Sequence, residues 1–142
     1  MWTALISALP DETTLHPPAP ESAIRECAQL LGHRLPDQLA ALLRESNGVE
    51  GAYGLGLIWP IERIAADNLA IRRNGGFAPL FYMPFDPLLF FADAGNGDQF
   101  ALVPHTDRSD VFAWNHENDS RTWVAPGLAE YLEWWLTGRI KL

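Results

Sequence analysis

The spacing of the apolar residues changes near the middle of the chain. In the first half they recur every three or four positions, which is the period of a helix with one buried face. Helices are therefore predicted within residues 1–9, over 21–31, from 36 to about 46, and from 60 to about 74. Residues 11–20 contain three prolines and are predicted to form an extended linker.

Particular residues mark where these helices begin and end. Pro36 and Pro60 are predicted to open their helices, because the first helical position needs no backbone N–H. Asn47 and Gly48 are predicted to end the helix that Pro36 opens, since both residues tolerate a left-handed backbone.

In the second half, the apolar residues form short runs separated by turn residues. Residues 88–92 are continuously apolar, as in a strand that is buried on both faces. Gly95, Asn96 and Gly97 predict a hairpin turn. The other predicted strands are residues 99–103, 110–114 and 121–125, with an earlier strand over residues 55–59.

The order of these elements predicts the fold class. Helices come first, a meander of antiparallel strands follows, and a helix that begins at Pro126 closes the chain. We therefore predict an α+β fold, a twisted and mainly antiparallel sheet with helices packed on one side, rather than the βαβ alternation of nucleotide-binding folds. Residues 1–20 are expected to form a short helix and a Pro-rich linker, residues 21–142 a single domain, and residues 75–87 an irregular packed connection.

The charge of the chain limits its partners. Eighteen Asp and Glu against ten Lys and Arg give a formal net charge of −8 over 142 residues. We therefore expect no binding to nucleic acid or to anionic membrane surfaces. Between Asp86 and Ser120, six Asp and one Glu are opposed only by Arg108. This segment is interpreted either as a solvated acidic rim or as a face that attracts a basic protein.

Cysteine content and the apolar runs indicate the setting of the protein. Cys27 is the only cysteine, which excludes an internal disulfide and a multi-cysteine metal site, and its helical position predicts a buried small side chain. The first nine residues lack the basic start of a secretory signal, and no apolar run reaches the ~18 residues of a membrane span. The sequence therefore predicts a cytoplasmic protein with no membrane segment and no cofactor.

Five short motifs occur in an order that is typical of one superfamily. They are a Pro-started helix with a Ser-Asn-Gly end and an acidic, Gly-containing loop at 35–51, an apolar strand leading into Pro-Ile-Glu-Arg-Ile at 57–64, a hairpin with Asp-Ala-Gly-Asn-Gly-Asp at 89–102, a Val-x-x-Trp-x-His-Glu element at 111–120, and an apolar helix at 128–136. On these motifs the chain resembles the SUKH superfamily of Smi/Knr-type domains over nearly its whole length.

The resemblance implies a role in binding another protein. Bacterial members of this superfamily are commonly immunity proteins that neutralise toxins, often nucleases, and fungal members resemble regulatory scaffold modules in cell-wall control. We therefore expect a non-enzymatic module, a monomer or weak dimer, that binds a cognate toxin or another protein. The net charge favours a basic partner. A regulatory scaffold domain is the alternative, and a small metal-dependent hydrolase is a third hypothesis.

Several polar residues around the predicted turns are candidates for chemistry: Asp93, Asp98, His116, Glu117 and Asp119. Carboxylates beside an imidazole can hold a metal ion or act in acid–base catalysis. The same side chains can instead bond the backbone N–H groups of the turns, or contact a partner. No second His stands at ligand spacing from His116, and no known nucleophile or phosphate-binding motif is present. We therefore predict neither catalytic nor metal-binding residues.

The aromatic residues divide into core and surface candidates. Trp59, Trp114 and Trp135 are predicted in the core, whereas Tyr53 and Trp123 are predicted at the surface. An exposed aromatic side chain with acidic neighbours resembles the centre and rim of a protein interface. The residues predicted to face a partner are Glu50, Tyr53, Asp93, Asp98, Glu117 and Asp119. The residues predicted to maintain the structural motifs are Pro36, Asn47, Gly48, Pro60, Gly95, Gly97 and Trp114.

Overall fold

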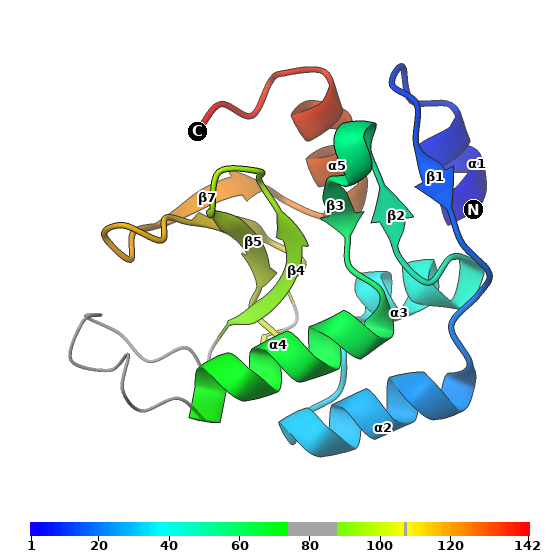
Figure 1. The fold of residues 1–142 in the computed structure, drawn as a ribbon, viewed down its shortest axis with the longest axis vertical. Helices are drawn as coiled ribbons and strands as arrows, with labels where there is room; N and C mark the ends of the chain where they lie inside the picture. Colours follow the sequence, from blue (N-terminus) through cyan, green and yellow to red (C-terminus); the bar gives the residue numbers. More distant parts are fainter. Residues whose placement is uncertain (74–87, 107) are drawn as a thin grey trace.

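The computed structural model describes residues 1–73, 88–106 and 108–142 (Figure 1). The connection predicted over residues 75–87 lies outside the described residues. The described helices are α1 (Trp2–Ser7), α2 (Glu21–Leu31), α3 (Asp37–Glu45), α4 (Ile61–Arg73) and α5 (Leu128–Leu136). They confirm the helices that the apolar spacing predicts. Among these described helices, none is long and apolar enough to cross a membrane.

The strands form two antiparallel sheets. The first has the order β1 (Thr14–Leu15), β2 (Val49–Glu50) and β3 (Gly56–Ile58), with a short 3-10 helix, η1 (Ala52–Gly54), between β2 and β3. The second has the order β4 (Leu89–Asp93), β5 (Gln99–Leu102), β6 (Val111–Trp114) and β7 (Arg121–Ala125). The α+β class is confirmed, although the strands divide into two sheets. β1 and β2 are two residues long and lie in stretches predicted as a linker and a loop, because so short a strand leaves no periodic pattern.

The turn between β4 and β5 uses the two predicted glycines. φ is +98° at Gly95 and +96° at Gly97, whereas Asn96 does not have a positive φ. The Ala94 N–H donates to the Asp98 carbonyl oxygen at 3.0 Å and closes the turn. The hairpin is confirmed, with its left-handed positions at the glycines on either side of the asparagine.

Asn47 and Gly48 fix the start of α4 rather than ending α3, which stops before them at Ser46 in an extended conformation (φ −149°, ψ 123°). α3 begins directly after Pro36 and α4 directly after Pro60, each one residue later than predicted. The Asn47 side-chain oxygen accepts a hydrogen bond of 2.8 Å from the Ile61 N–H. Gly48 has a φ of +95°, and a Cβ atom there would lie 2.9 Å from the Pro60 nitrogen. Only glycine fits where these two segments cross.

The N-terminal helix α1 packs against α3. Trp2 and Ile6 are buried in the hydrophobic core. The Glu45 carboxylate, at the end of α3, accepts hydrogen bonds from the N–H groups of Thr3 at 3.0 Å and Trp2 at 3.1 Å. These bonds satisfy free donors at the start of α1 and lower the pKa of the Glu45 carboxyl to about 2. The division of the chain at residue 20 stays a prediction.

The closing helix α5 lays an aromatic side chain on the four-stranded sheet. The Tyr131 ring centroid lies 5.3 Å from that of Phe91 in β4 and 4.8 Å from that of Phe100 in β5, both in edge-to-face geometry. The Tyr131 hydroxyl donates to the Leu57 carbonyl oxygen of β3 at 2.9 Å. Burial raises the pKa of Tyr131 well above its ordinary value. One buried side chain therefore contacts both sheets.

The burial of the other aromatic residues largely follows the prediction. Trp59 and Trp114 are buried and Trp135 is partly buried against the core. Tyr53 and Trp123 are both exposed, Tyr53 completely.

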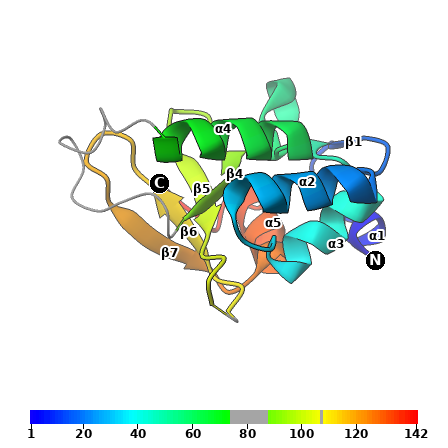
Figure 2. The ribbon, with the colours of Figure 1, turned by 90° about the horizontal axis from the view of Figure 1, so that it is seen from below.

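α4 contacts both β4 and α2, and Figure 2 shows α2 and α4 running side by side. The fully buried Asn68 side chain of α4 accepts a hydrogen bond from the Phe90 N–H and donates one to the Phe90 carbonyl oxygen, each at 2.8 Å. Asn68 therefore pairs with β4 as a neighbouring strand would. The Trp59 N–H, just after β3, donates to the Phe91 carbonyl oxygen at 2.7 Å and joins the two sheets.

Asn68→Ala is expected to lower the free energy of unfolding by about 2–4 kcal/mol, because the buried N–H and carbonyl groups of Phe90 would lose their partners. Urea unfolding followed by tryptophan fluorescence measures this change. Gln29→Ala, at an exposed position of α2, is the control and is expected to change the value by less than about 0.5 kcal/mol. A loss at Asn68 no larger than that of the control would contradict the role given to this side chain.

Candidate functional site

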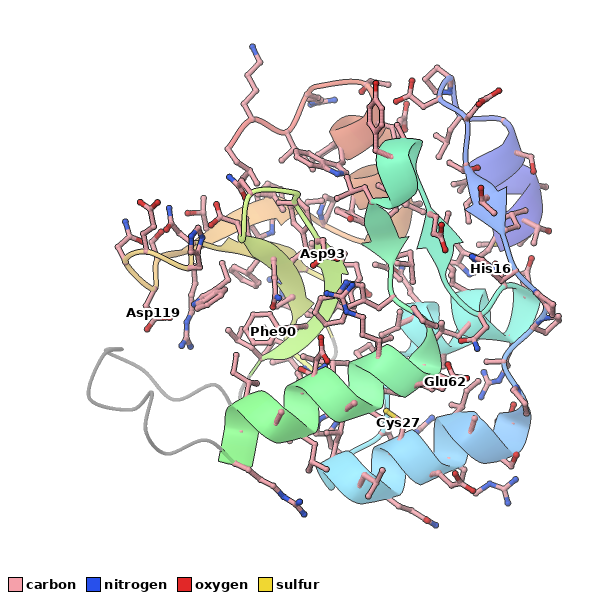
Figure 3. All side chains as sticks on the ribbon, in the orientation of Figure 1. His16, Cys27, Glu62, Phe90, Asp93 and Asp119 are labelled. Atoms are coloured by element: carbon pink, nitrogen blue, oxygen red, sulfur yellow. The ribbon has the colours of Figure 1, made fainter. Side chains whose placement is uncertain are left out.

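Asp93, labelled in Figure 3, forms a two-pronged ion pair with Arg63 of α4. Arg63 Nη1 and Nη2 lie 2.7 and 3.0 Å from the two carboxylate oxygens. Arg63 also donates through Nε to Asp67 at 3.1 Å, and its guanidinium lies 4.0 Å from the centre of the Trp59 ring. The Asp93 carboxylate therefore links α4 to the end of β4. From the sequence we expected this carboxylate to bond the backbone of the hairpin instead.

Asp98, just before β5, is buried and bonded to His116 of the β6–β7 loop. His116 Nδ1 lies 2.6 Å from Asp98 Oδ1, and the His116 backbone N–H donates to the same oxygen at 3.1 Å. Burial by itself would raise the pKa of the Asp98 carboxyl, but the hydrogen bonds from His116 outweigh it, and this pKa lies below its ordinary value. A Cβ atom on Gly97 would lie 2.9 Å from the imidazole. The two turns are therefore closely fitted to each other.

Asp119 is buried inside the β6–β7 loop and holds the loop together through its hydrogen bonds. The residue is 3% exposed and has a φ of +59°. Its carboxylate accepts hydrogen bonds from Trp114 Nε1 at 2.7 Å and from Arg121 Nη2 at 3.1 Å. The burial of Asp98 and Asp119 favours the structural interpretation of these two residues over a partner-facing one.

The acidic segment between Asp86 and Ser120 has fewer unpaired carboxylates than the count of its charges indicates. Two of its carboxylates pair with arginines that lie outside the counted segment, Arg63 and Arg121. A third carboxylate, Asp110, pairs with Arg108. Glu117 is exposed and forms no ion pair within the described residues. In the described part of the chain, no group of three or more His, Cys, Asp and Glu side chains is arranged to hold a metal ion.

A different part of the molecule presents an exposed aromatic residue among acids. Tyr53 in η1 has a φ of +59° and lines a hollow of about 560 Å³ together with Asp11 and Glu12. Both of these acids are exposed. Glu50, in the adjacent β2, pairs with His16 at 3.2 Å. We call Asp11, Glu12, Glu50 and Tyr53 the Tyr53 surface.

A second hollow, of about 460 Å³, lies beside β2, β3 and the start of α4, and we call it the β2–α4 groove. Val49, Ile58 and Trp59 form the buried apolar part of its lining, and Glu50 and Arg63 are charged. Most of the lining belongs to the first two motif segments named above.

The residues predicted to face a partner do not form one patch. Glu50 and Tyr53 lie three residues apart in β2 and η1, whereas the other four belong to the β4–β5 and β6–β7 turns. Figure 3 shows His16, the partner of Glu50, and Asp119 on opposite sides of the molecule. Among the predicted residues, only Glu50, Tyr53 and Glu117 are exposed.

A family comparison bears on all of these residues. A model of the SMI1 / KNR4 family (SUKH-1) matches residues 18–134, which span α2 to most of α5. The chain belongs to this family. The resemblance drawn from the five motifs is thereby confirmed. A search among curated proteins gives no match.

The SUKH-1 match contains every residue predicted to face a partner. It does not contain the two acids that line the same hollow as Tyr53. Asp11 and Glu12 lie before the matched region. The sequence analysis misses them because they occur in a stretch interpreted as a linker. It also misses the ion pair between Arg63 and Asp93, which lie 30 positions apart. No local pattern predicts a pair that far apart.

In this SUKH-1 domain, Asp98→Asn is expected to lower the free energy of unfolding by about 1–3 kcal/mol near neutral pH, since a charge-assisted bond from His116 is lost. The pKa of Asp98 is lower in the folded chain than its ordinary value of 3.8. Its contribution is therefore present above that ordinary value and is lost as the pH falls through the folded value.

Urea unfolding at about pH 6 and about pH 2 tests this expectation, with the gap between parent and Asp98→Asn closing at the lower pH. Glu117→Gln, on the exposed part of the same loop, is the matched control and is expected to change stability little at either pH. A gap of the same size at both pH values would contradict the assignment.

Proposed function

We propose that this SUKH-1 domain is an immunity protein that binds a cognate bacterial toxin and blocks it. The Tyr53 surface contacts a basic region of the toxin, such as the substrate groove of a nuclease. Bound there, the domain occludes the groove sterically and neutralises its charge. It performs no reaction of its own.

The observation that carries this proposal is the placement of Tyr53. A tyrosine with 107% relative exposure gains nothing from the core of its own protein. Its φ of +59° also costs on the order of 1–2 kcal/mol for a residue with a Cβ atom. The ring is thus held outward at a cost to stability, as is typical of functional positions. Tyrosine is enriched among the residues that dominate binding energy at protein interfaces.

The charges around Tyr53 support a basic partner. Asp11 and Glu12 line the same hollow as the tyrosine, Glu50 precedes the tyrosine by three residues, and the whole chain carries a net charge of −8. An acidic rim attracts a basic surface over a distance of about 8–10 Å at physiological salt and repels acidic competitors. Charge therefore accelerates encounter with the toxin, and the aromatic ring supplies most of the affinity.

The position of the acids supports a division of roles within the surface. Glu50 and Tyr53 lie inside the region that the family model matches, whereas Asp11 and Glu12 precede it. We assign the anchoring contact to Tyr53 and the selection among toxins to the N-terminal acids.

Tyr53→Ala is expected to weaken toxin binding by about 30-fold or more, the loss typical of a central aromatic residue at an interface. The probe is the product of the neighbouring toxin-like gene, purified as an inactive variant, and isothermal titration calorimetry measures Kd. Leu30→Ala removes an exposed apolar side chain on α2 and is expected to leave Kd unchanged. Equal affinities of the parent and of Tyr53→Ala would contradict the proposal.

The association rate with the same toxin variant is expected to fall about tenfold or more between about 0.05 M and about 0.5 M NaCl. Stopped-flow fluorescence measures this rate. The double variant Asp11→Asn, Glu12→Gln is expected to show a shallower dependence on salt, and Glu26→Gln, an exposed acid of α2, the parent dependence. A rate that does not change with salt would remove the electrostatic part of the proposal.

A further inference from the structure

His33 follows α2 and forms hydrogen bonds through both of its ring nitrogens. Gly32 ends the helix with a φ of +78°, and the His33 N–H donates to the Ala28 carbonyl oxygen at 3.2 Å, which holds the histidine against the last turn of α2. On the half-buried ring, Nε2 lies 3.0 Å from Arg72 Nη2, and Nδ1 lies 2.9 Å from the Arg34 carbonyl oxygen. The imidazole therefore connects the end of α2 with the end of α4.

These two bonds determine the charge and the tautomer of His33. A guanidinium has donors only, so Nε2 accepts from Arg72 and carries no hydrogen. The Arg34 carbonyl oxygen is an acceptor only, so Nδ1 carries the hydrogen and donates it. His33 is thus a neutral imidazole, and a second proton would have to enter between Nε2 and the Arg72 guanidinium.

Arg72 joins the end of α2 to the start of β4. Its guanidinium also donates to the Leu31 carbonyl oxygen, in the last residue of α2, at 3.3 Å and to the Leu88 carbonyl oxygen, just before β4, at 2.9 Å. These two carbonyl oxygens keep their charge at every pH, whereas the His33 imidazole titrates near neutrality. Protonation of His33 would replace a hydrogen bond of 3.0 Å by repulsion between two cations.

The groups that face His33 favour its neutral form. The His105 ring, in the β5–β6 loop, has its centroid 5.1 Å from that of His33. Burial lowers the pKa of His33 below its ordinary value of 6.5, the bond to the Arg34 carbonyl opposes this shift, and Arg72 and His105 add to it. Cys27 of α2 adds no charge beside Arg72, because burial raises the pKa of its thiol to about 11. Within the described residues, no carboxylate bonds to the imidazole.

We propose that the contact between His33 and Arg72 is a pH-sensitive switch in the joint between α2 and α4. The neutral imidazole accepts the hydrogen bond from Arg72 and holds the end of α2 against α4. When the imidazole is protonated, the two cations repel each other and the end of α2 separates from α4. α4 itself keeps its place, because Asn68 pairs with β4 and does not titrate. This inference goes beyond the proposed function and does not depend on toxin binding.

The direction of the pH effect follows from the linkage between protonation and folding. Because the pKa of His33 is lower in the folded chain, the unfolded chain takes up the proton more readily. The contribution of His33 to stability is therefore complete above the ordinary value of 6.5 and is lost as the pH falls from there toward the folded value. At about pH 5.5, a histidine that stays neutral in the fold raises the equilibrium constant of unfolding by at most about tenfold.

The first measurement is made on the full chain labelled with ¹⁵N. Long-range ¹H–¹⁵N spectra of the histidine rings are recorded between about pH 7.5 and about pH 5.5, and His33→Gln assigns the His33 signals. At the higher pH, His33 is expected to show a hydrogen on Nδ1 and none on Nε2. A hydrogen on Nε2, or a ring that is already charged at the higher pH, overturns the proposal.

The second measurement is urea unfolding at the same two pH values, with His33→Gln as the comparison. The Gln amide can accept from Arg72 and donate to the Arg34 carbonyl oxygen at either pH. Relative to this variant, the parent's equilibrium constant of unfolding is expected to rise about threefold to tenfold at the lower pH. His105→Gln, the matched control, is expected to keep the parent's dependence. Equal dependence in the parent and in His33→Gln, or loss of the dependence in His105→Gln alone, overturns the proposal.

The buried thiol of Cys27 reports the opening directly, since it is the only cysteine and lies on α2 beside Arg72. At about pH 5.5, its reaction with 4,4′-dithiodipyridine is expected to be about threefold or more faster in the parent than in His33→Gln, and at about pH 7.5 the two rates are expected to agree. Equal rates at the lower pH overturn the separation of α2 from α4.

Discussion

The outer edge of β4 is the constraint on which the rest of this structure depends. A buried strand must have partners for its backbone groups on both edges, and β5 serves only one of them. On the other edge, Asn68 pairs with both polar backbone groups of Phe90, and the Trp59 N–H pairs with Phe91. Any shift of α4 along the strand would leave buried groups unpaired, at a cost of about 1–3 kcal/mol each. The helix therefore has one position.

The position of α4 in turn determines the geometry of the β2–α4 groove and of the Tyr53 surface. With Asn68 fixed at Phe90, Arg63 of the same helix reaches Asp93 at the end of the strand and lies over the Trp59 ring. The start of α4 meets Asn47, so β2 and η1, which follow directly, are held beside it. The groove wall and the support of the Tyr53 surface are thus extensions of the joint between the two sheets.

This dependence explains which features the sequence predicts. Helix and strand periods and turn residues are local, and the predicted elements agree with the structure within a few residues. The partner of a charge is not local: counting acids within one segment overlooks Arg63, thirty positions before its partner Asp93. Asn68 left a usable signal, because it shares the buried face of α4 with Ile61 and Ile64. A polar residue on an apolar stripe requires a buried partner, although the sequence does not say which.

The carboxylates of the two sheets differ in how far they are engaged within the fold. In the four-stranded sheet and its turns, carboxylates such as Asp98 and Asp119 are buried and engaged, so a change there disturbs the fold. Three exposed acids near a hollow, Asp11, Glu12 and Glu50, lie beside the three-stranded sheet, whose first two strands have two residues each. Such short strands contribute few hydrogen bonds, and the Tyr53 ring contributes no core packing. Under the proposed function, substitutions that retarget the domain to another toxin fall where they cost the least stability.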